Sequence, residues 1–458
     1  MIKVKVAGAG AGKTYGLAED ILKRSVEIFP SRKRLYALTY TNTAKEKIRY
    51  EIVRQNGEIP KNVTIETVHS FLISEIIIPF SHFSINEVYN KASICFVGSR
   101  KEFKAKRIKQ LKDNKIIHVD RVFEIAKQVI DNTCSKHKTK SQKEKVKFVG
   151  DILSSCIDSI FLDEAQDLDE HALRFFEVIS NGEINVFMVG DPKQAIKYTG
   201  TFQSLIDKLT IGGVLDTVTF NNFTRRVPKE ILVLSNEFCP DVQRQESISK
   251  ISGKISYIEN TNDKYIEFIK SSMDNGCIVC IDKKTGKYLT KKNTKVTFPY
   301  DIDLKLGSSY RRNGRDVNLF CLSIVDEFIS WKLNGQNAVS KLVSKYNLTL
   351  SKSEYAQLYE WDKSIERETN GVIVSSIDSV KGLEADVVIF ILTKNTLNYL
   401  LKIEFDLNNK FNKEWNKVYV ALTRSQRELI FVLDHELLEL AHIEFARKAL
   451  KNMGINHL

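Results

Sequence analysis

The chain has 458 residues, with 69 lysines and arginines against 57 aspartates and glutamates, which gives a formal net charge of +12. With 43% hydrophobic residues it can bury substantial cores, and at roughly 100–200 residues per domain its length suggests about two to four domains. Its 21 glycines and 7 prolines argue against a collagen-like or disordered chain, and its apolar runs fall short of the ~18 residues that a membrane span needs. We expect a cytoplasmic protein with no signal peptide and no membrane partner.

Short apolar runs rich in β-branched residues alternate with helical stretches along the chain. One group of runs lies at 4–6, 35–40, 159–162 and 186–189, and a second group lies at 372–376, 387–392 and 429–433. Strands separated by helices predict parallel sheets with crossover connections. Because a long interval divides the two groups, we predict an α/β fold with two parallel-sheet modules flanked by helices, rather than one large sheet.

A lysine-rich, helix-like region lies between the early strands, from about residue 75 to about residue 150. Lysine runs can bind the phosphates of a nucleic acid, since each neutralised phosphate releases a counterion. They are more often a solvated helix face, and Glu102, Asp113 and Glu144 dilute the positive charge here. Both interpretations stay open at this point.

A glycine-rich loop follows the first predicted strand and precedes a helical pattern. It reads Ala7-Gly8-Ala9-Gly10-Ala11-Gly12-Lys13-Thr14. Small residues let successive backbone N–H groups face phosphates at a helix N-terminus, while Lys13 reaches the outer phosphates and the Thr14 hydroxyl can ligate Mg²⁺. The loop therefore predicts a nucleoside triphosphate site, with Ala7 in place of the usual opening glycine.

Polar residues at two later strand ends complete this predicted site. An apolar strand ends in Asp163 and Glu164, which places the first carboxylate near the metal and the second where it can polarise an attacking water. Another strand is followed by Gly190, Asp191 and, three residues later, Gln194, whose amide lies within plausible reach of a γ-phosphate.

These segments, in this order, resemble the motor core of superfamily 1 helicases of the UvrD/Rep branch. Further segments that match the family's motifs are Thr39-Tyr40-Thr41-Asn42-Thr43-Ala44, Thr67-Val68-His69-Ser70-Phe71, Asn222-Phe223-Thr224-Arg225-Arg226-Val227-Pro228, Ile377-Asp378-Ser379-Val380-Lys381-Gly382-Leu383-Glu384 and Val418-Tyr419-Val420-Ala421-Leu422-Thr423-Arg424-Ser425. The resemblance implies two RecA-like domains that bind ATP and Mg²⁺ between them. It also implies movement along single-stranded DNA in the 3′→5′ direction, with possible duplex unwinding.

The resemblance assigns further roles to residues of the second module. Arg424 and Arg226 would stabilise charge on the transferring phosphoryl group, with Arg225 the competing choice because the local alignment can slip by one residue. Gly382 and Glu384 would face the nucleotide, and Gln194 would couple the γ-phosphate to the DNA path.

By the same resemblance, a set of polar and aromatic residues lines the path of single-stranded DNA. These are Thr39, Thr41, Asn42, Thr67, His69, Tyr198 and Ser379. Tyr198 would stack on a base, and a simply buried tyrosine is the alternative. The glutamine that reads adenine in relatives has no counterpart before the loop, so we expect ATP to be favoured among nucleoside triphosphates, with Phe223 the nearest candidate to stack on the base.

Domain boundaries follow from the positions of the motifs. We place the first motor domain at 1–75 and 150–220, a lysine-rich insertion at 76–149, the second motor domain at 221–260 and 360–445, a reduced second insertion at 261–359 and a C-terminal tail at 446–458. Both insertions are short compared with those of relatives, so a compact motor is implied.

Two alternatives to a free-standing helicase remain. The chain could be the motor or DNA-sensing ATPase subunit of a complex with a nuclease or other effector partner, as in compact helicases of antiphage systems such as Gabija. It could also be a non-motor switch in which nucleotide controls assembly. A motor predicts strong stimulation of ATP hydrolysis by DNA, whereas a switch predicts none.

Overall fold

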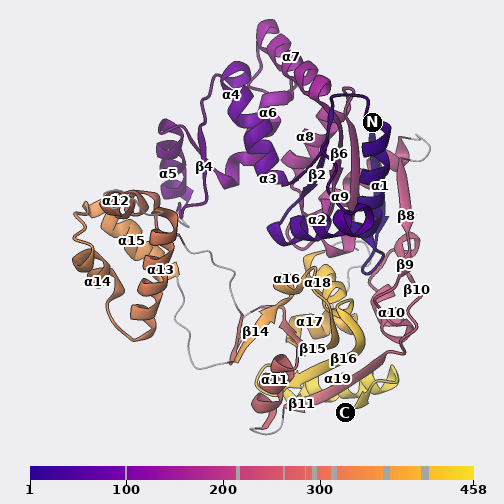
Figure 1. The fold of residues 1–458 in the computed structure, drawn as a ribbon. Helices are drawn as coiled ribbons and strands as arrows, with labels where there is room; N and C mark the ends of the chain where they lie inside the picture. Colours follow the sequence, from indigo (N-terminus) through magenta and orange to yellow (C-terminus); the bar gives the residue numbers. More distant parts are fainter. Residues whose placement is uncertain are drawn as a thin grey trace. The chain divides into compact units, whose positions relative to one another are not determined.

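The structure is a computed structural model that describes residues 1–97, 101–212, 217–260, 264–283, 285–290, 297–310, 317–364, 372–403 and 412–458. The chain divides into two compact units (Figure 1). The larger unit comprises Met1–Ile76, Phe123–Lys291 and Val372–Leu458, and the smaller unit comprises Ile77–Val122 and Lys292–Gly371.

The first sheet of the larger unit has six parallel strands in the order β3-β2-β6-β7-β1-β8. Their bounds are Ile2–Ala7 (β1), Arg34–Thr39 (β2), Val63–Thr67 (β3), Ile157–Leu162 (β6), Asn185–Gly190 (β7) and Val218–Asn221 (β8). Helices α1 (Lys13–Glu27) and α2 (Asn42–Asn56) pack on this sheet through Leu17, Ile21 and Ile48. Helices α8 (Glu170–Ser180) and α9 (Thr201–Ile211) contact β7 and β8. We call this sheet with its helices the first domain.

The second sheet has seven parallel strands in the order β13-β14-β12-β15-β16-β11-β17. Their bounds are Lys254–Asn260 (β11), Ile278–Ile281 (β12), Tyr288–Thr290 (β13), Val372–Ser376 (β14), Ala385–Leu392 (β15), Ser425–Asp434 (β16) and Asn456–His457 (β17). Alternate residues of β15 serve two cores, since Val388 and Phe390 join one apolar cluster and Ile389 joins the other. The predicted α/β fold with two parallel-sheet domains is confirmed.

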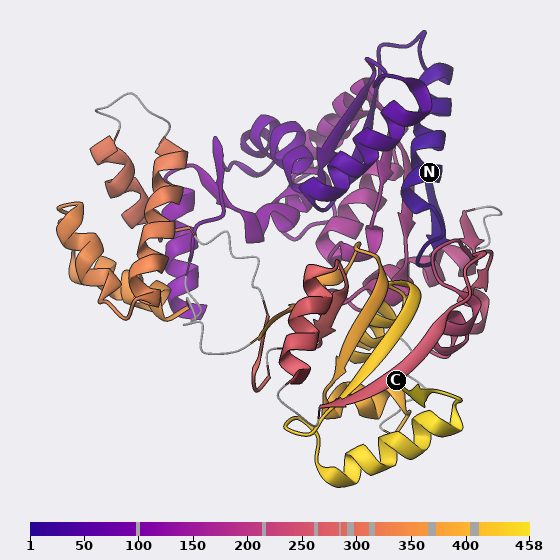
Figure 2. The ribbon, with the colours of Figure 1, turned by 60° about the horizontal axis from the view of Figure 1, so that its bottom comes forward.

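Helices cover both faces of this second sheet. The helices in contact with its larger core are α10 (Lys229–Asn236), α16 (Ile377–Val380), α17 (Lys394–Leu400), α18 (Lys413–Leu422) and α19 (Leu440–Asn452), and α11 (Lys264–Asp274) packs on the other core. Figure 2 shows the strands with α19 in yellow beside them. Two short strands, β9 (Phe223–Thr224) and β10 (Glu246–Ser247), pair on either side of α10 in the chain. We call the second sheet, its helices and this pair the second domain.

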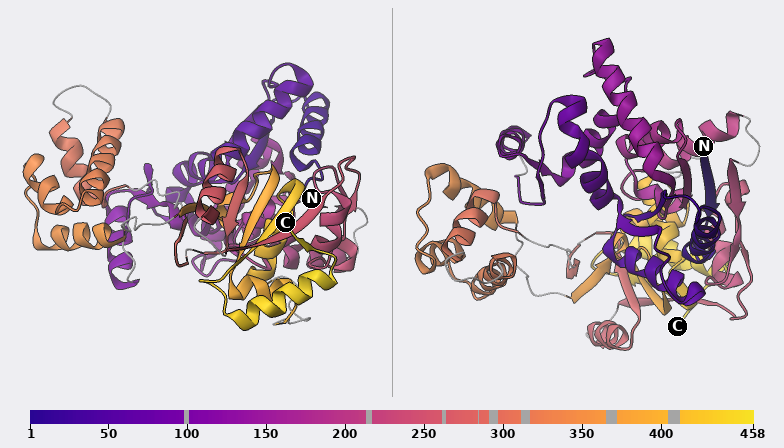
Figure 3. Two further views of the ribbon diagram at one scale, coloured as in Figure 1. Left: turned by 90° about the horizontal axis from the view of Figure 1, so that it is seen from below. Right: turned by 45° about the horizontal axis from the view of Figure 1, so that its top comes forward.

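The smaller unit is built mainly from helices, seen in two further views in Figure 3. Helices α12 (Tyr300–Tyr310), α13 (Val317–Leu333), α14 (Ala338–Lys345) and α15 (Lys352–Ser364) enclose a core that contains Phe298, Phe328 and Trp361. The same unit holds the strand pair β4 (Lys91–Ser93) and β5 (Ile116–His118) and helix α5 (Lys101–Asp113). An ion pair between Arg107 and Glu360, at 3.4 Å, links α5 to α15.

Each predicted insertion contributes to both units. Helix α6 (Val122–Ile130) and most of α7 (Lys140–Cys156) fall in the expected insertion 76–149, yet both helices lie almost wholly in the larger unit, and so do α11 and β12 of the expected insertion 261–359. Residue 261 itself lies outside the described residues. The assignment of motor domains and insertions by function stays a prediction.

One helical run is long and apolar. It comprises α3 (Val68–Phe71), a π-helical segment (Leu72–Ile77) and α4 (Ile78–Ile85). By length and composition these 18 residues, with a mean hydropathy of 1.3, qualify as a candidate membrane span, and 39% of them are buried. Buried core helices meet the same criterion, and Phe71, Leu72 and Ile76 are fully buried here. The expected absence of a membrane partner stays a prediction.

Candidate nucleotide and nucleic-acid sites

The glycine-rich loop joins β1 to α1 at the carboxyl edge of the first sheet. Gly10 and Gly12 adopt left-handed backbone conformations, with φ of 71° and 73°, which glycine adopts without strain. Gly12 caps α1 without any side-chain hydrogen bond. The first N–H groups of α1 are therefore left for a ligand, as phosphate binding requires. Ala7 and Ala9 are buried beside these glycines, and Asn221 steadies the loop by donating to the Ala11 carbonyl at 3.1 Å.

Both predicted carboxylates lie directly beside this loop. The Thr14 hydroxyl donates to Asp163 Oδ2 at 2.9 Å, and Lys13 Nζ lies 3.5 Å from Glu164 Oε2. A threonine hydroxyl and a buried carboxylate are the oxygen ligands that Mg²⁺ prefers, so the residues present fit that ion. The structure thus brings together Lys13 and Thr14 at the start of α1 with Asp163 and Glu164 directly after β6.

Burial and charge separate the two carboxyl groups. Burial, together with the adjacent charge of Glu164, raises the pKa of Asp163 to about 6. Burial acts in the same direction on Glu164, but the positive charges of Lys13 and Lys381 outweigh it and lower the pKa of Glu164 to about 2. Glu164 is therefore ionised at neutral pH, as a group that polarises water has to be.

The backbone at Glu164 is strained. Its φ is +54°, a conformation that non-glycine residues rarely adopt and that occurs more often at functional sites. The Glu164 N–H donates to Asp163 Oδ1 at 2.9 Å, and the Gln166 amide donates to the Glu164 carboxylate. Gln166 also accepts the Asp191 N–H at 2.9 Å, so one side chain connects two loops of the site.

The loop from Asp191 to Gln194 is buried and meets Arg424 of the second domain. Gln194 donates to Asp191 Oδ2 at 2.9 Å and accepts from Arg424 Nη2 at 3.3 Å. Arg424 is 1% exposed, and this burial, with the nearby charge of Arg226, lowers the pKa of its guanidinium to about 10. It still carries a positive charge at neutral pH.

Arg226 and Arg225, the two alternatives for the second arginine of the site, make different contacts. Arg226 forms an ion pair with Glu384, and its Cβ lies close to Gly10, where an added Cβ would be 2.5 Å away. Arg225 is exposed, and only its backbone N–H reaches the loop, at 3.1 Å from the Gly10 carbonyl. Nearby, Gly382 has a φ of 79° and accepts from Lys47 Nζ at 2.9 Å.

Several hydroxyl groups expected on the DNA path serve the local backbone. Thr41 caps α2 by accepting the Ala44 N–H at 3.1 Å, and Thr67 caps α3 by accepting the Ser70 N–H at 3.2 Å. Ser379 donates to the Ser376 carbonyl at 2.7 Å. Two further candidates differ: Thr39 is fully buried, with a hydroxyl that has no partner, and Asn42 is exposed at the start of α2.

The predicted His69 and Tyr198 belong to a cluster of rings beside these caps. Ring centroids lie 4.5 Å apart for His69 and Phe123 and 5.4 Å apart for His69 and Tyr40. Lys197 donates to the Tyr40 hydroxyl at 3.2 Å and lies over the Tyr198 ring at 4.9 Å from its centroid. Tyr198 is only half-buried. Tyr40, His69, Phe123, Lys197 and Tyr198 form what we call the aromatic cluster.

Several of the residues that the structure brings to these sites were not among the predicted site residues. Tyr40 and Lys197 lie inside segments that carried the motifs, so their polar or aromatic character was a usable signal. Phe123 lies in α6, far from any motif, and Gln245 lies next to the two-residue strand β10. No sequence pattern pointed to either of them.

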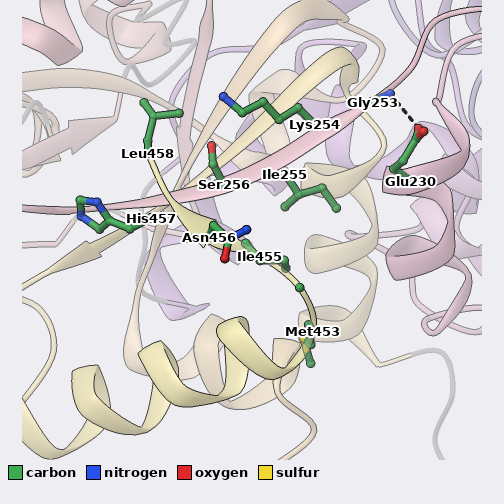
Figure 4. Close-up of a pocket in the computed structure, with 11 residues that line it drawn as sticks. Glu230, Gly253, Lys254, Ile255, Ser256, Met453, Ile455, Asn456, His457 and Leu458 are labelled. Atoms are coloured by element: carbon green, nitrogen blue, oxygen red, sulfur yellow. Dashed lines mark hydrogen bonds between the residues drawn. The ribbon is translucent and has the colours of Figure 1, made fainter.

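A surface pocket lies elsewhere, at the β11 and β17 edge of the second sheet (Figure 4). Its lining includes Ile255, Ser256, Met453 and Leu458, and the Glu230 carboxylate accepts the Gly253 N–H there at 2.7 Å. None of the predicted site residues lines this pocket.

Two family models and one known protein match this chain. Residues 2–200 and residues 313–436 each match a family described as an AAA domain. "Gabija protein GajB" of Bacillus cereus (strain VD045) is 23% identical over 512 residues, which cover 98% of this chain and 96% of that protein.

The crystal structure of "Arterivirus nonstructural protein 10 (helicase)" aligns with a TM-score of 0.36 and 11% identity, over 96% of this chain and 62% of that one. Its complex with DNA aligns with a TM-score of 0.36 and 11% identity, over 94% and 60%. This chain thus spans less than two thirds of those helicases. The two family matches are to AAA domains, and none of these matches distinguishes the UvrD/Rep branch.

Proposed function

We propose that the protein is an ATP-driven motor of the UvrD/Rep type that acts in the cytoplasm and moves along single-stranded DNA, in the 3′→5′ direction. The observation that supports it most is the meeting of two domains at one site. Lys13 and Glu164 come from the first domain, and Arg424 of the second domain reaches Gln194 of the first at 3.3 Å. Hydrolysis at such a site can be linked to movement between the domains.

The nucleotide would be held by the loop backbone and Lys13, and Mg²⁺ by Thr14 and Asp163. The ion supplies positive charge that neutralises charge developing on the phosphates. Glu164, ionised and steadied by Gln166, would accept hydrogen bonds from the attacking water. Arg424 and Arg226 would stabilise charge on the transferring group, a role whose loss costs about 10³–10⁵ in rate in comparable enzymes.

Gln194 would link this chemistry to the DNA. It lies in the same loop as Lys197 and Tyr198, so a shift of its amide on loss of the γ-phosphate would reach the aromatic cluster over three or four residues of backbone. Bases stacked on aromatic side chains contribute about 1–3 kcal/mol each. A small displacement of the cluster would then change the affinity for single-stranded DNA.

The proposal is tested by ATP-dependent displacement of streptavidin from biotinylated single strands. The protein should displace it from the 5′ end, toward which 3′→5′ movement leads, and should not do so from the 3′ end. Lys13→Ala is the blank. Hydrolysis that DNA stimulates without any displacement would contradict the motor. A parallel RNA strand shows whether ribose is accepted, and a forked duplex shows whether the motor unwinds.

The match to the Gabija protein GajB favours a second candidate, a motor or DNA-sensing ATPase subunit that works with a nuclease or other effector partner. The similarity extends over 98% of this chain, including both domains. In that case, the purified chain would show weak activity that rises when the partner is added. A non-motor switch would instead hydrolyse ATP at a rate that DNA leaves unchanged.

A further inference from the structure

Two buried glutamines of the second domain reach the nucleotide site of the first. Gln243 and Gln245 are 2% and 3% exposed and alternate in the segment that leads into β10. The side-chain Oε1 of Gln243 accepts from Lys193 Nζ at 3.3 Å, and Gln245 Nε2 donates to the backbone carbonyl of Ala9 at 3.2 Å. Asn236 holds the backbone of Gln245 on both sides, at 2.9 and 2.8 Å. One short segment therefore contacts both loops.

The hydroxyl of Tyr419, in α18, lies at the centre of this contact. It is 3.1 Å from Gln245 Oε1, 3.3 Å from Asp191 Oδ2 and 3.4 Å from the Ala9 nitrogen, and the tyrosine is 1% exposed. The hydroxyl can accept the Ala9 N–H, and its one proton serves either Gln245 or Asp191. A buried hydroxyl with two competing acceptors has two alternative hydrogen-bond arrangements.

The glycine at position 8 is explained by the same contact. A Cβ added to Gly8 would lie 2.2 Å from Gln245 Cδ and 2.3 Å from its Oε1, well inside any allowed separation. The loop therefore lacks a side chain where the second domain approaches it most closely. This use of glycine is separate from the left-handed backbone that Gly10 and Gly12 require.

A set of contacts connects the phosphate loop to the loop from Asp191 to Gln194, whose chain continues into the aromatic cluster. It runs from Ala9 through Tyr419 to Asp191, which also accepts the Gln194 amide at 2.9 Å and pairs with Lys193 at 2.9 Å. Lys197 and Tyr198 follow in the same stretch of chain. Because the linking groups are buried, each one left without its partner would carry a substantial free-energy cost.

We infer that Gln245 and Tyr419 are positioning residues, which hold the phosphate loop in register with the loop from Asp191 to Gln194 and so transmit nucleotide binding to the nucleic-acid path. The inference rests on the proposed function. It gives the second domain a part in ordering the phosphate loop, in addition to supplying the arginines. Gln245 acts through the Ala9 carbonyl, and Tyr419 acts through the Ala9 N–H and the Asp191 carboxylate.

The test uses Tyr419→Phe, Gln245→Ala and the double variant, with Tyr288→Phe as the matched control. Tyr288 is also a buried tyrosine of the second domain whose hydroxyl bonds an aspartate, Asp434, but it lies in the other core of the sheet. If Gln245→Ala does not fold, Gln245→Glu keeps the shape and loses the donor to Ala9. Steady-state hydrolysis gives KM and kcat for ATP, and fluorescent ATP gives its Kd.

Tyr419→Phe and Gln245→Ala should each raise KM and Kd for ATP by about five- to tenfold, the usual size of one unsatisfied buried hydrogen bond. KM and Kd of the double variant should exceed those of the more weakly binding single variant by less than about twofold, because both substitutions disrupt the same network. The nucleotide-induced change in DNA affinity should also fall by about fivefold. Tyr288→Phe should lower the melting temperature and leave KM unchanged.

Wild-type KM and Kd in both variants, or multiplication of the two single effects in the double variant, would overturn the inference. A wild-type chain that binds ATP without hydrolysing it would refute the proposed function, while the Kd values would still decide this inference. A chain that binds no nucleotide would refute both.

Discussion

The nucleotide site and the proposed DNA path lie at the same carboxyl edge of the first sheet, yet they are built differently. At the nucleotide site, Lys13, Thr14, Asp163 and Glu164 come together within hydrogen-bond or ion-pair distance. On the proposed DNA path, the hydroxyls of Thr41 and Thr67 cap helices, and a cluster of rings lies beside them.

The difference reflects what each ligand demands. A triphosphate with its metal needs specific charged groups and small residues in a fixed order. Few substitutions are therefore tolerated, and the motif can be recognised in the sequence. A stacked base needs only an aromatic ring in a suitable orientation, and such rings can gather from segments without a motif, as Phe123 of α6 does beside His69. A single substitution at the nucleotide site should therefore remove most of the ATPase activity. A single substitution on the proposed DNA path should weaken DNA binding only in part.

Removal of Arg424 should have the greatest effect. Arg424→Ala is expected to lower kcat for ATP by about 10³ or more, because the transition-state charge loses its partner. Arg424 also bonds the Val420 carbonyl at 3.0 Å, so Arg424→Lys serves as a second, less disruptive variant that loses the forked geometry. Hydrolysis is measured at saturating ATP.

The neighbouring arginines provide the control for that loss. Arg226→Ala should lower kcat by at least about 10² in the same assay, while Arg225→Ala, at an exposed side chain, should stay within about twofold of wild type. The opposite order would show that the local alignment is shifted by one residue.

Glu164→Gln should stop turnover while nucleotide still binds. The amide cannot accept a proton, and general-base groups contribute about 10²–10⁴ in rate. Fluorescent ATP binding should remain within about threefold of wild type. Gln166→Ala, which removes a hydrogen bond to Glu164 without removing the carboxylate, is expected to cost less. Normal turnover in Glu164→Gln would refute its assignment as the base.

Combined replacement of His69 and Tyr198 by alanine should weaken single-stranded DNA binding by about ten- to a hundredfold, the loss of one or two stacking contacts. Fluorescence anisotropy of a labelled oligonucleotide measures this, and the Kd for ATP should not change. Tyr50→Ala removes an exposed tyrosine of α2 and should leave DNA binding intact. Unchanged affinity in the double variant would mean that the path lies elsewhere.

Substitutions at the two helix caps should have the smallest effects, and they distinguish a structural role of the hydroxyls from a role in DNA binding. Thr41→Ala and Thr67→Ala should each lower the free energy of unfolding by about 1 kcal/mol, and Thr→Ser at the same positions should restore it, since serine caps equally well. Chemical denaturation supplies the values. If alanine weakens DNA binding without any loss of stability, these hydroxyls contact the DNA rather than the helix.

The sequence predicted the two parallel sheets because alternation of apolar runs with helices is a local signal, and it identified charged residues that the structure gathers at one edge. It could not place Gln245 or Tyr419 against Ala9, because that contact depends on how two domains pack. Gly8 illustrates the limit. Its place in the motif suggested phosphate binding, whereas its missing side chain also makes room for Gln245.

The central claim is that nucleotide and nucleic-acid sites act on one another. Its most direct test is steady-state ATP hydrolysis by the purified chain with increasing single-stranded oligonucleotide, with Lys13→Ala as the blank. We predict stimulation of about tenfold or more that saturates with DNA concentration. Clear hydrolysis that no concentration of DNA changes would contradict the account.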